Sequence, residues 1–243
     1  MKLFLLVLLS LSAWTVAEDA PNTLSAEEKE AGYRLLFDGT RLAFKGVEKS
    51  NFLQSGWKVE GGALSLTKTI QQSGKVTGGD LATLESYVDF DFLFEWKIGV
   101  SGNSGVLYFA KTSLGSKPTG NEFQLIDDVH HPDGLKGGPI RRSGALYGIL
   151  PPSDAKKLNA TDWNKGRLLV QGNHVEHWIN DEKVLEYEIG SPAFQQAVKA
   201  SALKLPMGFG AKVRGPILLL DEGEEVSFRN LKIKVPGAPP AAR

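Results

Sequence analysis

Histidine, carboxylate and guanidinium side chains gather in one part of this 243-residue sequence. All four histidines lie between His130 and His177, and a long, polar, irregular segment covers 127–152. A loop of that length inside a compact domain is usually functional. Its side chains offer metal ligands, acid–base groups and oxyanion-binding groups, although a solvated loop whose charges pair with one another would have the same composition. The residues concerned are Asp127, Asp128, His130, His131, Arg141, Arg142 and Tyr147.

A second pair of histidines belongs to an alternating stretch that predicts a strand at 175–179. Successive side chains of a strand point to opposite faces, so His174 and His177 should face opposite ways. A metal site shared by these two histidines is therefore not expected, and their spacing differs from the helical H-E-x-x-H zinc motif. We expect one of them in the core or on the outer face of the sheet.

Two other expected strands carry rows of polar side chains. Glu122 and Gln124 share one strand face, and Glu95 and Lys97 alternate with large apolar residues. On the concave face of a sandwich these rows would form the floor of a cleft, whereas on an ordinary antiparallel sheet they would be the solvent face. The indole ring of Trp163 can stack on the apolar face of a sugar ring, although a place in the core is more common for tryptophan.

The elements that must position these groups are mostly short strands, because 27 Gly and 12 Pro favour turns over long helices. Two helices are expected, one after the capping box of Ser25 and Glu28 and one at 193–202 after Ser191 and Pro192. Many short strands without alternating helices predict an all-β fold, an antiparallel β-sandwich or jelly roll. The expected strands cover 56–60, 63–67, 90–100, 106–110, 122–127, 166–171, 175–179, 183–187, 208–212, 217–220 and 226–235.

Composition excludes several classes of protein. The 28 basic and 28 acidic residues cancel, so the chain has no basic field for nucleic acid or an anionic membrane surface. The lack of Cys excludes a disulfide framework, a thiolate nucleophile, a zinc finger and an iron–sulfur cluster. With 42% hydrophobic and 23% charged residues, disorder of the whole chain is excluded as well.

The first residues predict export. Lys2 precedes an apolar run at 3–11 that has the length of a signal h-region and is too short to span a bilayer, and 15–17 reads as a small-x-small cleavage site. We expect cleavage after Ala17, the alternative being an uncleaved anchor. The mature protein would then be soluble and periplasmic or extracellular, with no membrane anchor. The predicted organisation is a signal peptide at 1–17, a leader and short helix at 18–32, a single domain at 33–235 and a disordered tail at 236–243.

Short motifs that occur in a fixed order also give the chain a family resemblance. Together they resemble the DUF1080 family, the 3-keto-disaccharide hydrolase domain, over nearly the whole expected mature chain. The motifs are LFDGT at 36–40, WKVEGGAL at 57–64, GGDL at 78–81, FEWKI at 94–98, GNSG at 102–105, EFQLID at 122–127, GALY at 144–147, WN at 163–164, VEHWIN at 175–180 and VSFRNLKIK at 226–234.

The resemblance implies a concanavalin-like jelly roll and an enzyme that acts on 3-keto-glycosides, as a hydrolase or as a lyase–hydratase that passes through a 2-hydroxy-3-keto-glycal. It implies a carbohydrate ligand and, in some members, a divalent metal ion, whereas no cofactor is certain from the sequence. The family often has Gln-Asp-His-Gly before its last strand. This chain has Leu220-Asp221-Glu222-Gly223 there, which leaves open a different substrate or an inactive protein.

A ketone at C3 of a sugar acidifies the proton at C2, so cleavage by elimination needs a base, an electrophile at the C3 oxygen and an acid for the leaving oxygen. Direct hydrolysis by a carboxylate pair is one alternative, and a non-catalytic, lectin-like carbohydrate-binding module is another. The expected catalytic residues are His177, Glu122, His130, His131 and Tyr147. The expected substrate-binding residues are Glu95, Lys97, Gln124, Asp127, Arg142, Trp163, Asn180 and Asp221.

Overall fold

A computed structural model describes residues 20–47, 56–67, 79–113, 116–153, 158–159 and 161–237. The predicted signal peptide with its cleavage site lies outside these residues, as does the predicted tail from residue 238 onward. Within the described ranges, no helix has both the length and the apolar character needed to cross a membrane.

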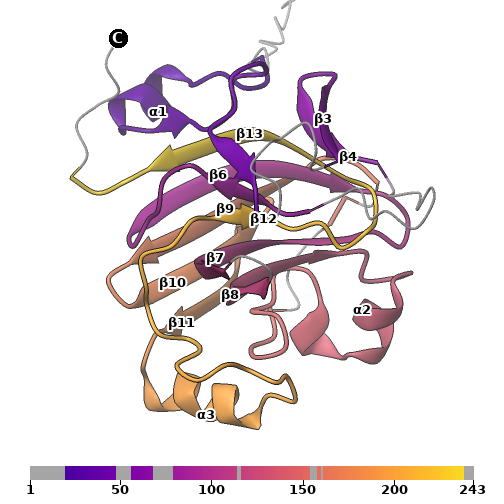
Figure 1. The fold of residues 1–243 in the computed structure, drawn as a ribbon, viewed down its shortest axis with the longest axis vertical. Helices are drawn as coiled ribbons and strands as arrows, with labels where there is room; N and C mark the ends of the chain where they lie inside the picture. The colour runs from indigo at the N-terminus through magenta and orange to yellow at the C-terminus, as the bar shows by residue number, and fades with distance from the viewer. Residues whose placement is uncertain are drawn as a thin grey trace, which may run out of the picture.

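Two antiparallel sheets form the body of the protein (Figure 1). The larger contains β1 (Arg34–Leu35), β3 (Trp57–Glu60), β4 (Ala63–Leu66), β6 (Phe90–Ile98), β9 (Asn164–Gln171), β10 (His174–Ile179), β11 (Glu182–Glu188) and β13 (Val226–Lys234). The smaller contains β2 (Phe44–Gly46), β5 (Leu81–Thr83), β7 (Asn103–Ser113), β8 (Ser116–Ile126) and β12 (Leu218–Leu219). Their orders are β11-β10-β9-β6-β13-β4-β3, with β1 beside β13, and β2-β5-β12-β7-β8. This architecture confirms the predicted antiparallel sandwich.

Short helices lie at the periphery of the two sheets (Figure 1). The two predicted ones are α1 (Ala26–Glu30), which begins with the predicted capping box, and α3 (Pro192–Ala200), whose N-cap is Ser191. A third, α2 (Pro132–Lys136), and a 3-10 helix (Pro139–Arg141) lie in the segment that was expected to be irregular.

One predicted strand is wrong. Residues 207–210 form turns and 211–212 belong to no strand, because Gly208 and Gly210 adopt positive φ angles of 74° and 78° that a regular strand does not contain.

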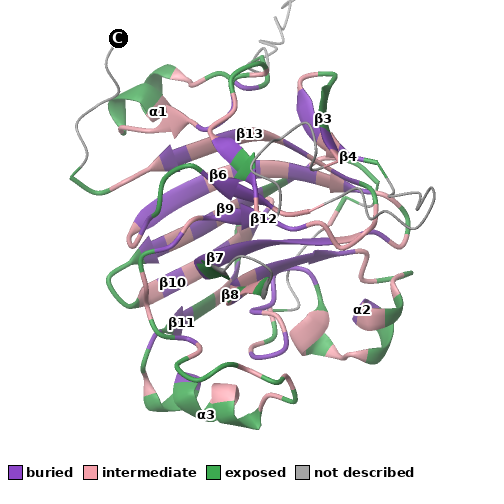
Figure 2. Ribbon diagram, viewed as in Figure 1, coloured by how far each residue is buried: buried purple, intermediate pink, exposed green. Residues whose placement is uncertain are grey.

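The core lies between the sheets, where strands alternate between buried and more exposed side chains (Figure 2). Phe94 of β6 packs edge-on against Phe123 of β8, with ring centroids 5.7 Å apart. Because side chains alternate along a strand, the polar neighbours of these two rings point away from the core on opposite sides. Glu95 therefore belongs to the outer face of the larger sheet, and Glu122 to the outer face of the smaller sheet.

Candidate functional site

The predicted catalytic and substrate-binding residues occupy separate places and do not line one cleft. Alternation along β6 and β8, which belong to different sheets, sends their polar rows in opposite directions. The outer face of the smaller sheet carries Glu122 and Gln124, and Asp221 follows the end of β12. The outer face of the larger sheet carries Glu95, Lys97, Trp163 and Asn180, whereas His177 lies between the sheets.

His177 is completely buried, which corrects the expectation that it meets substrate. Its Nε2 lies 2.9 Å from the Tyr108 hydroxyl and its Nδ1 lies 2.9 Å from the Gly144 carbonyl oxygen. Burial lowers the pKa of this imidazole to about 4, although the bond to Gly144 opposes that shift. A neutral histidine with both ring nitrogens bonded to protein groups is a structural element of the core.

Four acidic residues in or beside strands of the smaller sheet influence one another through their charges, and we call Asp80, Glu122, Asp221 and Glu222 the carboxylate cluster. Glu122 belongs to β8, Asp80 immediately precedes β5, and the other two follow β12. The backbone N–H of Asp221 donates to Asp80 Oδ1 over 2.9 Å, and Asp221 Oδ2 accepts the Gly79 N–H over 2.7 Å. Pairing of β5 with β12 thus joins residues that are 141 positions apart in the chain.

Glu122 is half-buried, and the neighbouring strand leaves room for its carboxyl group. A Cβ atom on Gly105 of β7 would lie only 2.7 Å from Glu122 Oε1, so the lack of a side chain there makes space for the carboxylate. With the amide of Gln124 oriented to satisfy its neighbours, its nitrogen donates to Glu122 Oε1 over 2.9 Å and to the Ser104 carbonyl over 3.0 Å. Gln124 therefore holds Glu122 in position.

Two carboxyl groups of the cluster have raised pKa values. Burial, and then the negative charge of Glu222, raise the pKa of Glu122 to about 8. Burial raises the pKa of Asp80 to about 6, with Glu222 and Asp221 contributing and the bond from the Asp221 N–H opposing. Lys117, whose Nζ lies 3.4 Å from Glu222 Oε1, lowers both values. Titratable groups with perturbed pKa values that lie together are typical of active sites.

The segment after α2 lies along β8 and ties Tyr147 to the cluster. The Tyr147 N–H donates to the Glu122 carbonyl over 3.0 Å, but its hydroxyl donates to Asp133 Oδ2 over 2.8 Å. Arg141 Nη1 donates to Asp133 Oδ1 and to the Tyr147 hydroxyl. Burial and then Asp133 raise the pKa of Tyr147 further above its ordinary value. This hydroxyl is therefore committed to Asp133 rather than free to act as an acid.

The remaining residues of the 127–152 segment shape the loop. Asp127 accepts bonds from the backbone of Ser101 and from the ring of His130, whose Nδ1 lies 2.8 Å from its Oδ2. Partial burial opposes ionisation of Asp127, but these bonds lower its pKa. His131 is the N-cap of α2, where its Nδ1 accepts the Asp133 N–H, and Arg142 is exposed.

On the outer face of the larger sheet, predicted binding residues form a network of their own. Glu95 accepts bonds from Arg229 Nε over 2.6 Å and from Asn230 Nδ2 over 2.8 Å. The Arg229 guanidinium and the Lys97 ammonium lie 4.2 Å and 5.3 Å from the ring centroid of Trp163. Asn180 shapes the turn after β10, where its Oδ1 accepts the Lys165 N–H over 2.8 Å.

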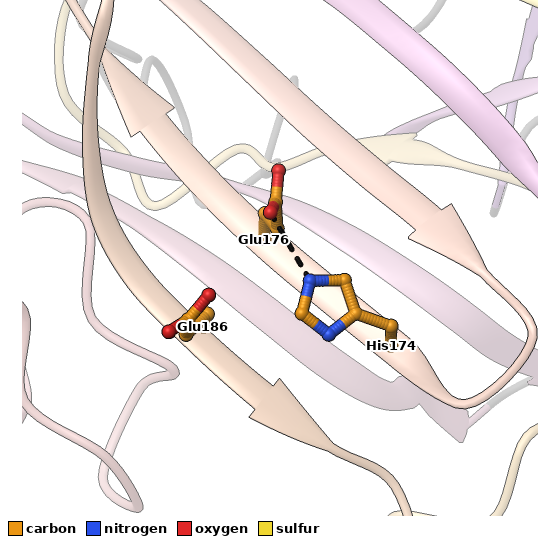
Figure 3. Close-up of side chains that lie close together, drawn as sticks. All are labelled: His174, Glu176 and Glu186. Carbon is orange, nitrogen blue, oxygen red and sulfur yellow. Dashed lines mark hydrogen bonds and ion pairs between the residues drawn. The ribbon is translucent and has the colours of Figure 1, made fainter.

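One group of described residues has the composition of a metal site. Ligand atoms of His174, Glu176 and Glu186 lie within 4.8 Å of one another, and the imidazole of His174 is turned towards Glu176 (Figure 3). Lys183 Nζ lies 3.3 Å from Glu176 and also contacts Glu186, and His174 Nδ1 lies 2.7 Å from Glu188. A divalent ion would have to displace this ammonium group. These residues therefore do not fit a resident divalent metal.

Sequence reasoning missed Asp80, Glu222 and Lys117 as members of the site. Asp80 is part of the GGDL motif at 78–81, and Glu222 stands where the resembled family often has His, so both were visible as motif positions. Their position beside Glu122 depends on the strand order β5-β12-β7-β8, which no local pattern reveals.

This chain is similar to known proteins in both sequence and fold. A family model described as the 3-keto-alpha-glucoside-1,2-lyase-like domain matches residues 32–234. A 3-keto-disaccharide hydrolase of Bacteroides thetaiotaomicron is 32% identical over a 260-residue alignment that covers 92% of this chain and 88% of the relative. A candidate glycosyl hydrolase from Parabacteroides distasonis is 30% identical with a TM-score of 0.77, covering 89% of this chain and 99% of the other. A second from the same organism is 24% identical with a TM-score of 0.60, covering 79% and 98%, and shows the fold alone.

Proposed function

The chain belongs to the family of 3-keto-alpha-glucoside-1,2-lyase-like domains, and from this premise we propose that it is an enzyme that breaks the glycosidic bond of 3-keto-glycosides. The family match confirms the resemblance carried by the sequence motifs. The observation that supports the proposal most directly is the carboxylate cluster, where Glu122 and Asp80 have raised and different pKa values on one sheet face.

The two raised pKa values suggest how the roles divide. Near neutral pH Asp80, with a pKa of about 6, is mostly ionised and can accept a proton. Glu122, with a pKa of about 8, is mostly protonated and can donate one. Pairs of carboxyl groups whose environments separate their pKa values are the usual arrangement of an acid and a base. We therefore assign Asp80 as the base and Glu122 as the acid.

In the proposed reaction Asp80 takes the proton at C2, beside the C3 ketone, and the electron pair becomes an enolate. Collapse of the enolate forms the C1–C2 double bond, restores the C3 ketone and breaks the bond from C1 to the leaving oxygen. Glu122 gives its proton to that oxygen. Addition of water to the resulting 2-hydroxy-3-keto-glycal places hydroxyl on C1 and a proton on C2, so the sum of the steps is hydrolysis.

Direct hydrolysis is the second candidate, because the same two carboxyl groups could serve as acid and water-activating base. The two routes differ at C2, which exchanges a proton only in elimination. The third alternative, a lectin-like module, would bind sugar without turnover and has no need of two carboxyl groups with raised pKa values.

The test is turnover of 3-keto-trehalose in heavy water, followed by NMR and compared with an enzyme-free sample. Deuterium at C2 of the released sugar supports elimination, and its absence supports direct hydrolysis. Asp80→Asn and Glu122→Gln should each lose at least about 100-fold in kcat. Glu182→Gln, the same change at an exposed residue of β11, should act as the wild type. Binding without turnover by the wild type would contradict the proposal in favour of a lectin-like module.

A further inference from the structure

Two adjoining hollows cross the outer face of the larger sheet, away from the carboxylate cluster. Their volumes are about 410 Å³ and 290 Å³, and both are lined by Glu95, Lys165 and Asp181. Because they share these lining residues, we treat the two hollows as one depression beside β9 and call it the β9 groove. Ligand-binding clefts are commonly about 300–1,000 Å³ in volume. Two adjoining hollows can hold two or more linked units.

The β9 groove has an aromatic ring in each half. Trp178 of β10 lines the first hollow beside Leu93 of β6, and Trp163 lines the second. The indole N–H of Trp178 donates to Glu176 Oε2 over 2.8 Å, and the guanidinium of Arg229 lies 4.2 Å from the Trp163 ring centroid. Both indoles are thus held by neighbours. Arg167 and Lys183 likewise lie 5.5 Å and 6.0 Å from the Trp178 ring centroid, so cationic side chains pack over both indoles. A sugar would contact the parts of these rigid rings that line the two hollows.

Charges in and beside the β9 groove are paired with one another. Such pairs leave lone pairs and N–H groups that can bond hydroxyls, whereas an ionic ligand would have to compete with an existing partner. The pattern therefore favours a neutral, hydroxyl-rich ligand. The pairs are Arg167 with Asp91 and Arg229 with Glu95, both bonded through the guanidinium, and Lys232 with Glu28 at 2.7 Å and Lys165 with Asp181 at 3.6 Å.

We propose that the β9 groove is a second, non-catalytic carbohydrate site that holds a neutral oligosaccharide chain. The two adjoining hollows, the placement of Trp178 and Trp163, and the paired charges all point to this class of ligand. The proposal does not rest on the function assigned to the carboxylate cluster, because the two sites lie on opposite faces of the sandwich. A protein with both sites would hold a glycan on one face while a short 3-keto-glycoside reacts on the other.

The test uses two groove variants. One places a larger side chain in the groove, and the other removes an aromatic side chain that lines it. Leu93→Trp places an indole on the groove floor, and Leu84→Trp makes the same change at a position that is 60% exposed outside the groove. Trp178→Ala removes the wall of the first hollow. Calorimetry with maltotetraose and with cellotetraose should show binding of at least one by the wild type. Leu93→Trp and Trp178→Ala should weaken it at least about tenfold, a loss of about 1.4 kcal/mol.

Two controls separate this proposal from the proposed function. Leu84→Trp and Glu122→Gln should bind the tetrasaccharide as the wild type does, and Leu93→Trp should turn over 3-keto-trehalose at the wild-type rate. Absence of binding by the wild type, binding by both groove variants as tight as that of the wild type, or loss of binding in Glu122→Gln alone would overturn the proposal. Because one variant fills the groove and the other empties it, a folding failure in one leaves the other as the test. If the wild type lacks turnover, the binding result still stands by itself.

Discussion

The imidazole of His177 stacks flat on the ring of Phe123, with centroids 4.3 Å apart and planes inclined by 8°. Phe123 stands between Glu122 and Gln124 on β8, so the histidine supports from inside the sandwich the strand whose outer face bears the site. Its bond to the Gly144 carbonyl also ties the 127–152 segment to β10, while the Gly144 N–H donates to the Gln124 carbonyl of β8 over 2.9 Å. His177 is therefore a fully buried link between the core and the strand that carries Glu122.

Replacing His177 with alanine should destabilise the protein. The change leaves a cavity against Phe123 and a Gly144 carbonyl without its partner, which together cost roughly 2–4 kcal/mol of unfolding free energy. Urea unfolding of the variant and the wild type at neutral pH measures this difference.

His177→Phe is the matched comparison, because it keeps an aromatic ring of similar size and removes only the ring nitrogens. It should recover part of the stability and most of the turnover. A variant that is as stable as the wild type but has lost turnover would instead support a catalytic role for this histidine.

Because the pKa of Glu122 is raised in the folded protein, the free energy of unfolding should depend on pH. Between its ordinary value of 4.5 and its folded value of about 8, the folded state keeps a proton that the unfolded state has released. Stability must therefore fall as pH rises through this window. Glu122→Gln removes the titration, so its unfolding free energy relative to the wild type should increase between about pH 5 and pH 9, by something on the order of 1–3 kcal/mol.

Urea unfolding at both pH values, with Glu182→Gln as the exposed control, tests this prediction. The control should differ from the wild type by the same amount at the two pH values. A constant difference for Glu122→Gln as well would mean that its pKa is ordinary, and the acid assigned to the cluster would lose its support.

Alternation along single strands was enough to assign several side chains to their faces. The pattern of β10 places Val175, His177 and Ile179 together, and all three are buried. The pattern of β6 likewise separates Glu95 from the core phenylalanines. Period-two reasoning works here because it depends only on strand geometry.

The order of the strands within the two sheets could not be predicted from the sequence. The polar rows of Glu95 and Glu122 could have formed one cleft floor or an ordinary solvent face, but β6 and β8 belong to different sheets. Asp80 reaches Asp221 only through the pairing of β5 with β12, across 141 positions. The helix α2 has five residues, with Gly134 among them, and is too short to produce a detectable helical period.

Gly105→Ala should damage the site with little effect on the fold. The added Cβ would lie 2.7 Å from Glu122 Oε1 and 3.1 Å from Leu220 Cδ1, so the carboxyl group must move. A displacement of about 1 Å at a reacting group can cost on the order of 100-fold in rate. We expect kcat for 3-keto-trehalose to fall at least about tenfold while the melting temperature changes by only a few degrees.

Gly99→Ala is the control for this variant, since its Cβ would meet nothing closer than Glu225 Oε2 at 3.5 Å. It should retain turnover. Equal turnover by both variants would show that the position of Glu122 does not limit the reaction.

The pH dependence of turnover tests the division of roles between the two carboxyl groups. With Asp80 as the base and Glu122 as the acid, kcat/KM should be bell-shaped, with limbs near the folded pKa values of about 6 and about 8. Glu222 raises both pKa values through its charge, so Glu222→Gln should move both limbs to lower pH. In this variant Lys117 no longer pairs with a carboxylate at position 222. Its positive charge lowers the pKa of both Asp80 and Glu122 and so adds to the shift.

A matched change separates this charge effect from a steric one. Glu222→Asp keeps the negative charge and should leave both limbs close to their wild-type positions, even if the maximum rate changes. A profile of Glu222→Gln with unmoved limbs, or movement of one limb only, would mean that the two titrating groups are not both neighbours of Glu222. In that case the acid and base would have to be sought outside the carboxylate cluster, because Glu222 is the charge that Asp80 and Glu122 share.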